Sequence, residues 1–326
     1  MKAVIYTKTG GLEVVKQQSV QVPIPGDNQV LIEVKACALN IGDYQRFQTK
    51  NGKIPVSTHI TNKLMGYVGK PLGAEIAGIV TKTGRNVTRV KVGDAVFGKT
   101  AGTAPVGGIA EYAVMDADRV CLKPDNFSFE EASAVSISFD TALGAVRKAS
   151  ITNGQKVMIY GASGGVGLFA VQLAKVAGAE VTGVCSTRNI ELAKSAGCDR
   201  MIDYKKEDFT KTDIKYDAII GVNGCNPMKK YKSIMKENGI FVGGGNVNQA
   251  MKALVASFTS HNFTYYAGAF TKQPDYLQYA KELAEEGKLH PYIDKVYSVN
   301  ETKEAIQYLL SSHASGKVVI KIDFSK

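Results

Sequence analysis

The sequence has no tryptophan, only four histidines and no long apolar run. No stretch reaches the ~18 consecutive apolar residues of a membrane-spanning helix, so we expect no membrane partner. The first residues, MKAVIYTKTGG, carry one early lysine and no small-residue cleavage pattern. They predict a first strand and not a signal peptide.

Cysteine is scarce, and neither cysteine nor histidine shows a metal-binding spacing. The five cysteines stand singly, without a C-x-x-C pair. Single thiols suit a reducing compartment better than a disulfide framework, so the sequence predicts a cytoplasmic location. We interpret the histidines as surface or cap residues. They are His59, His261, His290 and His313.

The positive charge is dispersed along the chain. The formal net charge is +10, yet no basic block is longer than the pairs at 205–206 and 229–230. A dispersed positive balance is usually a solvated surface that attracts anions modestly. We therefore expect no nucleic-acid partner, and a phosphorylated cofactor is the more fitting anion.

Two styles of patterning divide the chain. Residues 1–122 consist of short strand-like runs separated by Gly, Pro and Asn. From Ser128, which is placed as a helix cap, helical and strand-like runs alternate, which is typical of a parallel sheet covered on both faces. The last passage is β-rich again. We predict one β-rich domain from 1–122 completed by 288–326, and one α/β domain from 123–287.

A glycine-rich corner at 160–178, YGASGGVGLFAVQLAKVAG, joins a buried strand to an apolar helix. It reads A-x-G-x-x-G at Ala162, Gly164 and Gly167, close to the dinucleotide fingerprint. The helix start would offer free N–H groups to phosphates. No Lys-Ser/Thr follows, which excludes a P-loop, while a corner needed only for close packing stays the alternative. The pattern predicts a doubly wound Rossmann sheet that binds a dinucleotide.

The end of the next strand indicates which dinucleotide is bound. An acidic residue there would bind the ribose hydroxyls of NAD. The sequence VTGVCSTRN has Ser186, Thr187 and Arg188 instead. Since an arginine can pair with a 2′-phosphate, we predict NADP(H), with a solvent-exposed helix cap as the alternative.

The order of these motifs carries a family resemblance. The β-rich module, GASGGVGLFAVQLAK, VCSTRN, IDYKKEDF and HASGKVVI together resemble the medium-chain dehydrogenase/reductase superfamily. Within it the chain is similar to the zinc-independent quinone oxidoreductase branch, near the chloroplast-type quinone and alkenal/one reductases. The resemblance implies an α/β fold with a GroES-like catalytic domain and an NADP-binding Rossmann domain. It also implies a homodimer.

The sequence differs from the zinc-dependent members of this family at the positions of the catalytic zinc ligands. Asn40 stands where zinc-dependent members have a cysteine, and Ala74 stands where they have a histidine. Glu75 alone does not hold a tetrahedral zinc, so we predict no metal. Without a Lewis acid, acceptors activated by conjugation are favoured, namely quinones and α,β-unsaturated ketones or aldehydes.

The resemblance also implies roles for individual residues. Asn40 is predicted to donate a hydrogen bond to the acceptor oxygen, and Tyr44 to donate a hydrogen bond or relay a proton. The alternative is that Asn40 only caps a helix and Tyr44 only forms part of the pocket wall. Glu75 and Asp43 are interpreted as structural, and the segment 46–73 as one wall of the pocket. The predicted cofactor-binding residues are Gln45, Thr141, Ser163, Gly164, Gly165, Val166, Ser186, Thr187, Arg188, Asn189, Tyr204, Val242, Gly243, Phe270, Gly316 and Lys317.

The sequence is compatible with three functions. The first is an NADPH-dependent reductase of quinones or conjugated carbonyl compounds. The second is a non-catalytic, NADPH-bound protein with a crystallin-like or RNA-binding role, since some members of the family have such roles. The third is an enoyl reductase of fatty-acid or polyketide synthesis.

Overall fold

The computed structural model describes residues 1–45, 68–100, 107–245, 247–266, 275–311 and 314–325. Two compact units make up the chain. The first unit comprises Met1–Ser136, Leu277–Glu285 and Ile293–Lys326, and the second comprises Ile137–Tyr276 and Glu286–Tyr292. None of the helices in the described ranges has the length and apolar character needed to cross a membrane.

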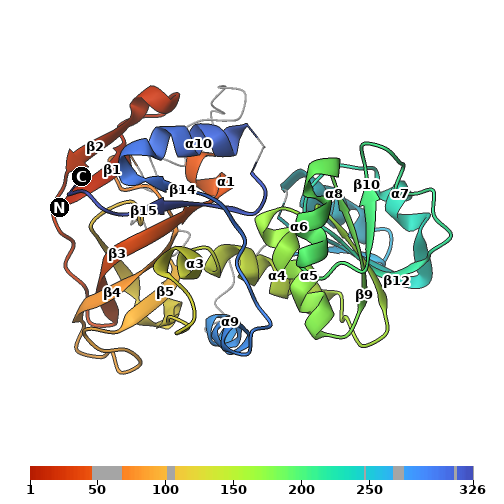
Figure 1. Ribbon diagram of the computed structural model, residues 1–326, viewed down its shortest axis with the longest axis horizontal. Coiled ribbons are helices and arrows are strands. Elements are labelled where there is room, and N and C mark those ends of the chain that lie inside the picture. The colour runs from red at the N-terminus through yellow and green to blue at the C-terminus, as the bar shows by residue number, and fades with distance from the viewer. Residues whose placement is uncertain (46–67, 101–106, 246, 267–274, 312–313, 326) are drawn as a thin grey trace. The chain divides into compact units, whose positions relative to one another are not determined.

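A seven-stranded sheet dominates the first unit (Figure 1). Its strand order is β14-β15-β3-β4-β5-β7, and β6 also pairs with β3. The strands are β3 (Gln29–Leu39), β4 (Glu75–Thr83), β5 (Ala95–Lys99), β6 (Tyr112–Asp116), β7 (Val120–Leu122), β14 (Ile293–Ser298) and β15 (Lys317–Lys321). β15 runs antiparallel to β3, which confirms that the C-terminal passage pairs with the first β-rich module. A separate hairpin joins β1 (Lys2–Tyr6) to β2 (Val15–Ser19).

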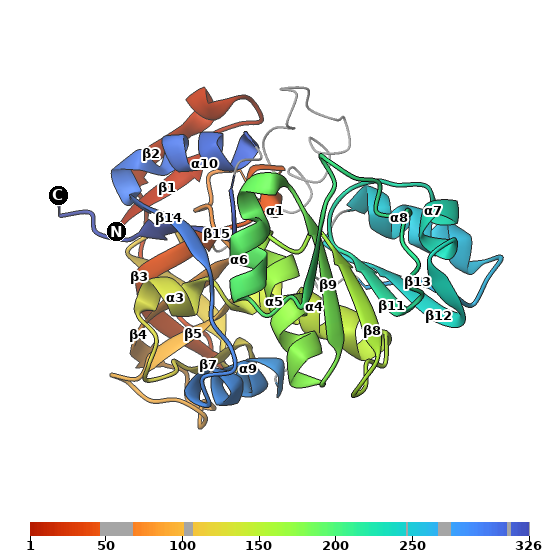
Figure 2. The same cartoon turned by 45° about the vertical axis from the view of Figure 1, so that its right-hand side comes forward.

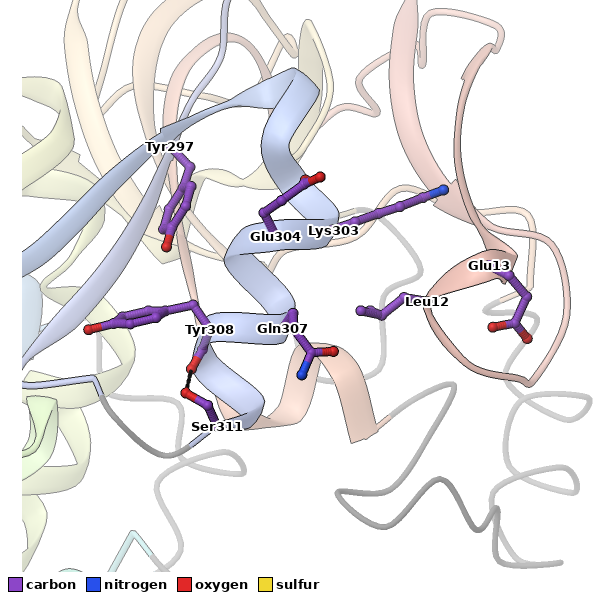
Figure 3. A pocket seen from close by; sticks show the side chains of 8 residues that line it. All are labelled: Leu12, Glu13, Tyr297, Lys303, Glu304, Gln307, Tyr308 and Ser311. Carbon is purple, nitrogen blue, oxygen red and sulfur yellow. Dashed lines mark hydrogen bonds between the residues drawn. The ribbon is translucent and has the colours of Figure 1, made fainter.

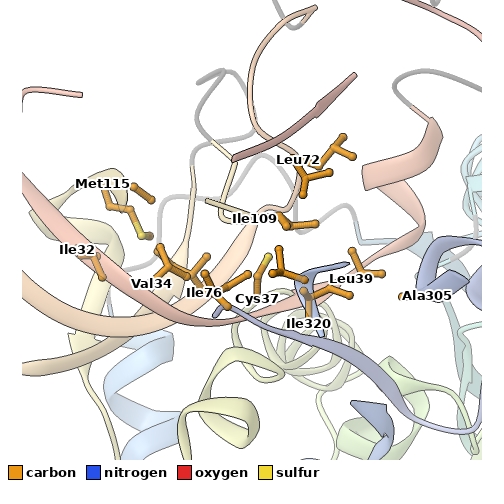
Figure 4. Packing of buried hydrophobic residues seen from close by; sticks show 14 of the residues in the cluster. Ile32, Val34, Cys37, Leu39, Leu72, Ile76, Ile109, Met115, Ala305 and Ile320 are labelled. Atoms are coloured by element: carbon orange, nitrogen blue, oxygen red, sulfur yellow. The ribbon is translucent and has the colours of Figure 1, made fainter. Parts of the chain in front are cut away.

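Alternating apolar residues of β3 build the core of this unit. Ile32, Val34, Cys37 and Leu39 are buried and belong to one cluster, which Figure 4 shows from close by. Ile320 of β15 packs into the same cluster. Burial of each such side chain contributes roughly 1.5–3 kcal/mol. The ends of β3, β4 and β15 are thereby fixed against one another.

Within the described residues, four helices belong wholly or mainly to the first unit. They are α1 (Ile41–Gln45), α3 (Phe129–Ser133), α9 (Asp275–Glu285) and α10 (Thr302–Leu310). Ser128 caps α3 as predicted, in a capping box with Glu131. The helical pattern that begins at Ser128 is interrupted at Ala134, which is completely buried and packs against the β3 alanines Ala36 and Ala38.

A six-stranded, fully parallel sheet forms the second unit. Its order, β10-β9-β8-β11-β12-β13, is the 3-2-1-4-5-6 order of the Rossmann fold. The strands are β8 (Lys156–Tyr160), β9 (Glu180–Cys185), β10 (Arg200–Asp203), β11 (Tyr216–Gly221), β12 (Met235–Gly243) and β13 (Phe263–Tyr265). The predicted Rossmann sheet and the GroES-like β-rich domain are both confirmed.

Helices cover both faces of this sheet. From β8 the chain moves outward to β10 and then outward in the other direction from β11 to β13. Since such crossovers are nearly always right-handed, the two sets of helices lie on opposite faces (Figure 2). The helices are α4 (Ser136–Lys148), α5 (Gly165–Val176), α6 (Ile190–Ser195), α7 (Met228–Lys232) and α8 (Val247–Ser257).

Candidate active site

The glycine corner lies at the point where the strand order of the second unit reverses. β8 and β11 are neighbours there, and ligands of open α/β sheets bind outside the carboxyl ends of such strands. The backbone N–H groups of Val222 and Asn223, just after β11, donate to the carbonyl of Tyr160 at 3.0 and 3.3 Å. The sequence motifs did not single out this loop, because only the strand order brings it beside the corner.

The glycines of the corner serve two different purposes. Gly161 has φ +91°, and a Cβ on Gly167 would lie 2.1 Å from the carbonyl oxygen of Gly161, so both are needed for the turn and for packing. Gly164 has an ordinary φ of −84° and caps α5. The atom nearest to a Cβ on Gly164 would be 3.8 Å away. Packing therefore does not require a glycine at 164.

Residues at the start of α5 form the rest of the glycine corner. Ser163, Gly164, Gly165 and Val166 are half-buried, whereas α5 is buried from Gly167 onward. The side-chain amide of Asn189 donates to the Ser163 hydroxyl oxygen at 3.0 Å. This bond connects the segment after β9 directly to the glycine corner.

The residues after β9 differ in their exposure and in their hydrogen-bond partners. Arg188 is exposed, while Ser186 is nearly buried. The hydroxyl of Thr187 donates to Asp203 at the end of β10, with 2.5 Å between the oxygens. This bond, with one from the backbone N–H of Lys205, holds the pKa of Asp203 below its ordinary value. Asp203 is an acidic neighbour that the sequence motifs missed.

The other predicted cofactor residues lie at the ends of neighbouring elements. Tyr204 directly follows β10 and is half-exposed, whereas Val242 and Gly243 end β12 and are buried. The Thr141 hydroxyl donates to the carbonyl of Ile137 at 2.9 Å, inside α4. A Cβ atom placed on Gly244 would lie 4.0 Å from the methyl carbon of Thr141, so α4 passes next to the end of β12.

In the first unit, Asn40, Glu75 and Lys317 lie together at the ends of three adjacent strands. Asn40 follows β3, Glu75 begins β4 and Lys317 begins β15. Because β3 runs antiparallel to both neighbours, its last residue lies beside the first residues of β4 and β15. Gly316, with φ +103°, makes the turn into β15.

Hydrogen bonds connect these three side chains. The Asn40 amide nitrogen donates to Glu75 Oε1 at 3.0 Å, and the Lys317 ammonium donates to Asn40 Oδ1 at 2.8 Å. Lys317 and Glu75 also form a close ion pair. Asn40 is therefore not a simple helix cap, although its backbone N–H is bound by the Asp43 carboxylate at 2.7 Å. The contact of Lys317 with the cofactor stays a prediction.

Some predicted residues lie outside the described part of the structure. The backbone of α1 includes Tyr44 and Gln45, but their side chains are not described. Phe270 and most of the predicted pocket wall, residues 46–67, also lie outside the described residues. Their predicted roles stay predictions.

Three buried thiols near these sites behave as packing groups. Burial raises the pKa of Cys185, next to Ser186, to about 11. It also raises the pKa of Cys198 to about 12, and it raises that of Cys37, where the Asp43 and Glu75 carboxylates add to the effect. These thiols stay protonated near neutral pH, so none is an activated nucleophile.

A groove of about 640 Å³ opens elsewhere on the first unit (Figure 3). None of the predicted catalytic or cofactor residues lines it. Its walls come from residues 12–13, from β14 and from α10. The lining residues are Leu12, Glu13, Tyr297, Lys303, Glu304, Gln307, Tyr308 and Ser311.

Comparison with known proteins places the chain among dehydrogenases and reductases. Residues 26–125 match the family described as alcohol dehydrogenase GroES-like domain, and residues 196–320 match zinc-binding dehydrogenase. The chain is 34% identical to a 2-methylene-furan-3-one reductase from Solanum lycopersicum over 98% of its own length and 79% of the relative. It is 32% identical, with the same coverage, to a chloroplastic NADPH-dependent alkenal/one oxidoreductase from Arabidopsis thaliana.

A solved structure agrees with these relatives. The quinone oxidoreductase from Coxiella burnetii superposes with a TM-score of 0.87 at 29% identity, covering 99% of both chains. The likeness therefore extends over both units and not over one domain alone.

Proposed function

The chain belongs to the medium-chain dehydrogenase/reductase superfamily, and on this premise we propose that it is an NADPH-dependent reductase of quinones or α,β-unsaturated carbonyl compounds. Its relatives are named as quinone, alkenal/one and 2-methylene-furan-3-one oxidoreductases or reductases. The observation that carries the proposal is the open space over Gly164, at the switch point of a Rossmann sheet. A dinucleotide phosphate gives that glycine a purpose that packing does not.

The preference for NADPH over NADH is part of this proposal. Arg188 is exposed at the end of β9, and the tip carries no acidic residue from Ser186 to Asn189. The positive charge favours a 2′-phosphate. The carboxylate of Asp203 accepts the Thr187 hydroxyl and the Lys205 N–H, so its oxygens are less available to bind the ribose hydroxyls of NAD. The remaining predicted cofactor residues are proposed as contacts of the same ligand.

Bound NADPH would supply the hydride, and the residues of this chain would hold the acceptor and manage its charge. We propose that the Asn40 amide donates a hydrogen bond to the acceptor oxygen, where negative charge develops. Tyr44, four residues later, would donate a second hydrogen bond or relay a proton to the α-carbon of an enone. A metal is not required for either role, in keeping with Asn40 and Ala74 at the positions of the family's zinc ligands.

A homodimer and a cytoplasmic location complete the proposal. Met251, Val255 and Phe258 are exposed apolar residues at i, i+4 and i+7 along α8 and its C-terminal end. α8 itself packs beside β13, the strand at one edge of the sheet. A second copy of the chain would cover both the exposed helix face and the edge strand.

The singly placed thiols support the proposed cytoplasmic location, although the Arabidopsis relative is named as chloroplastic.

An acceptor screen tests the proposed function. NADPH absorbance is followed with 1,4-benzoquinone, a simple enone and an enoyl thioester, and RNA retention is measured at moderate salt. We expect NADPH consumption with the quinone and the enone. Turnover of the thioester alone would favour the enoyl reductase, and RNA retention without any turnover would favour the non-catalytic function.

A further inference from the structure

Glu75 and Lys317 form an ion pair in the interior of the first unit. The Glu75 side chain is completely buried and that of Lys317 is 4% exposed. Other ion pairs of the described residues, such as Lys236 with Asp217, are partly solvated. Asn40, in contrast, is only half-buried. Asn40 is thus the partly exposed residue that contacts this buried charge pair.

Stability alone is a poor explanation for this pair. Two buried charges must lose their hydration, and replacing such a pair by apolar groups is often neutral or stabilising. A buried polar network does, however, hold its members in one arrangement. The group that this network holds through hydrogen bonds with both charges is the carboxamide of Asn40, a half-buried residue.

The two charges distinguish the two ends of the carboxamide. Its oxygen accepts from the Lys317 ammonium, and its nitrogen donates to the Glu75 carboxylate. A flipped amide would place N–H groups against the ammonium and oxygen against the carboxylate, so both contacts would become repulsive. The nitrogen also contacts the carbonyl oxygen of Ala38 at 3.5 Å, which is at the limit of a hydrogen bond and is easily exchanged for a better acceptor.

We propose that Glu75 and Lys317 are positioning residues, which fix the Asn40 carboxamide so that this exchangeable N–H is presented to the acceptor oxygen. The inference rests on the proposed function. It gives Glu75 a role in the reaction beyond structure and gives Lys317 a role besides any cofactor contact.

A mutant cycle tests whether the pair acts through Asn40. The charges are removed together in Glu75→Gln/Lys317→Met, so that no unpaired charge stays buried, and in Glu75→Gln/Lys317→Gln, which keeps hydrogen-bonding groups in place. Each double change is made in the natural chain and in Asn40→Ala. With NADPH saturating, we expect kcat for an enone to fall about 10–100-fold in the natural chain. We expect a less than about twofold further loss in Asn40→Ala, because the effects are not additive when they pass through one group.

Lys236→Gln, which removes a solvated ion pair of the second unit, is the matched control and should keep the wild-type kcat. An unchanged melting temperature in a double variant, together with the lost turnover, supports positioning over a structural role. Equal losses with and without Asn40 would overturn the proposal, as would full turnover in both double variants.

A second readout does not depend on turnover. The side-chain amide signals of Asn40 in ¹⁵N–¹H spectra are identified by their loss in Asn40→Ala. We expect them to be shifted from those of solvent-exposed asparagines in the wild type, and to move to ordinary exposed values in the double variants. Unchanged Asn40 signals in the double variants would contradict the proposal. If the wild type reduces no acceptor, the proposed function fails, and the spectra still decide whether the pair fixes Asn40.

Discussion

The hydroxyl of Thr187 donates a hydrogen bond to the carboxylate of Asp203, with 2.5 Å between the two oxygens. Thr187 follows β9 and Asp203 ends β10, so the bond joins the tips of two adjacent parallel strands. The hydroxyl proton of Thr187 is therefore already engaged in a hydrogen bond within the protein. In the proposed function, discrimination for a 2′-phosphate would therefore rest mainly on Arg188, the exposed cation at the same strand end.

The first prediction concerns this cofactor selectivity. Loss of one hydrogen bond to a charged group costs ~1.5–3 kcal/mol, or about one to two decades in affinity. Arg188→Ala should weaken NADPH binding by that amount and leave NADH binding nearly unchanged. Thr187→Val should change NADPH affinity much less. Fluorescence titration of both cofactors measures this, and an unaltered NADPH preference in Arg188→Ala would reject the role of Arg188.

The second prediction separates a ligand-binding glycine from a packing glycine. Gly164→Ala should fold normally, because a Cβ there meets nothing closer than 3.8 Å. It should nevertheless weaken NADPH binding by about tenfold or more, since the methyl group takes the space of a phosphate and lost contacts of ~1.4 kcal/mol correspond to tenfold. Gly167→Ala is the matched variant. Its Cβ would lie 2.1 Å from the Gly161 carbonyl, so it should lower stability by roughly 1–3 kcal/mol.

Thermal melts and NADPH titrations of both variants check this contrast. If Gly164→Ala binds NADPH like the wild type, the glycine corner serves packing only.

The third prediction is independence from metal. Among the described residues, no group of three or more His, Cys, Asp or Glu side chains is placed to hold a metal ion. Asn40 also engages its amide with Glu75 and Lys317. Dialysis against a strong chelator should leave NADPH turnover unchanged, and elemental analysis should find well under one zinc per chain. A stoichiometric zinc whose removal abolishes activity would refute this prediction.

The fourth prediction distinguishes the two classes of acceptor. Quinones are strongly electrophilic and need less stabilisation of developing negative charge than enones do. Asn40→Ala and Tyr44→Phe should therefore lower kcat/KM more for an enone than for a quinone. Removal of one such donor typically costs ~10²-fold for the sensitive substrate. Enone rates that stay at the wild-type value in both variants would rule out a catalytic role for the two residues.

Local features of the fold were predictable from the sequence because they depend on nearby residues. The capping box of Ser128 and Glu131 spans three positions, and the glycine corner with its flanking strand and helix lies within 156–176. The break at Ala134 was not predictable from helical periodicity. Ala134 lies in a buried cluster with Ala36 and Ala38, which are distant in the sequence.

The same distinction applies to the candidate site. The sequence indicated Asn40 and Lys317 separately, each from a family motif. Their meeting with Glu75 depends on strand pairing across 35 and 242 positions, which local patterns do not encode. Asp203 was missed for the same reason, because its bond to Thr187 requires β9 and β10 to be neighbours.

The most direct measurement of the central claim is kcat/KM of the wild-type protein for one enone and one quinone, each with NADPH and with NADH. Arg188 and the corner at Gly164 predict rapid turnover of both acceptors with NADPH and a kcat/KM at least about tenfold lower with NADH, the effect of ~1.4 kcal/mol of lost binding. No turnover of either acceptor, or equal turnover with the two cofactors, would contradict an NADPH-dependent reductase of quinones and conjugated carbonyl compounds.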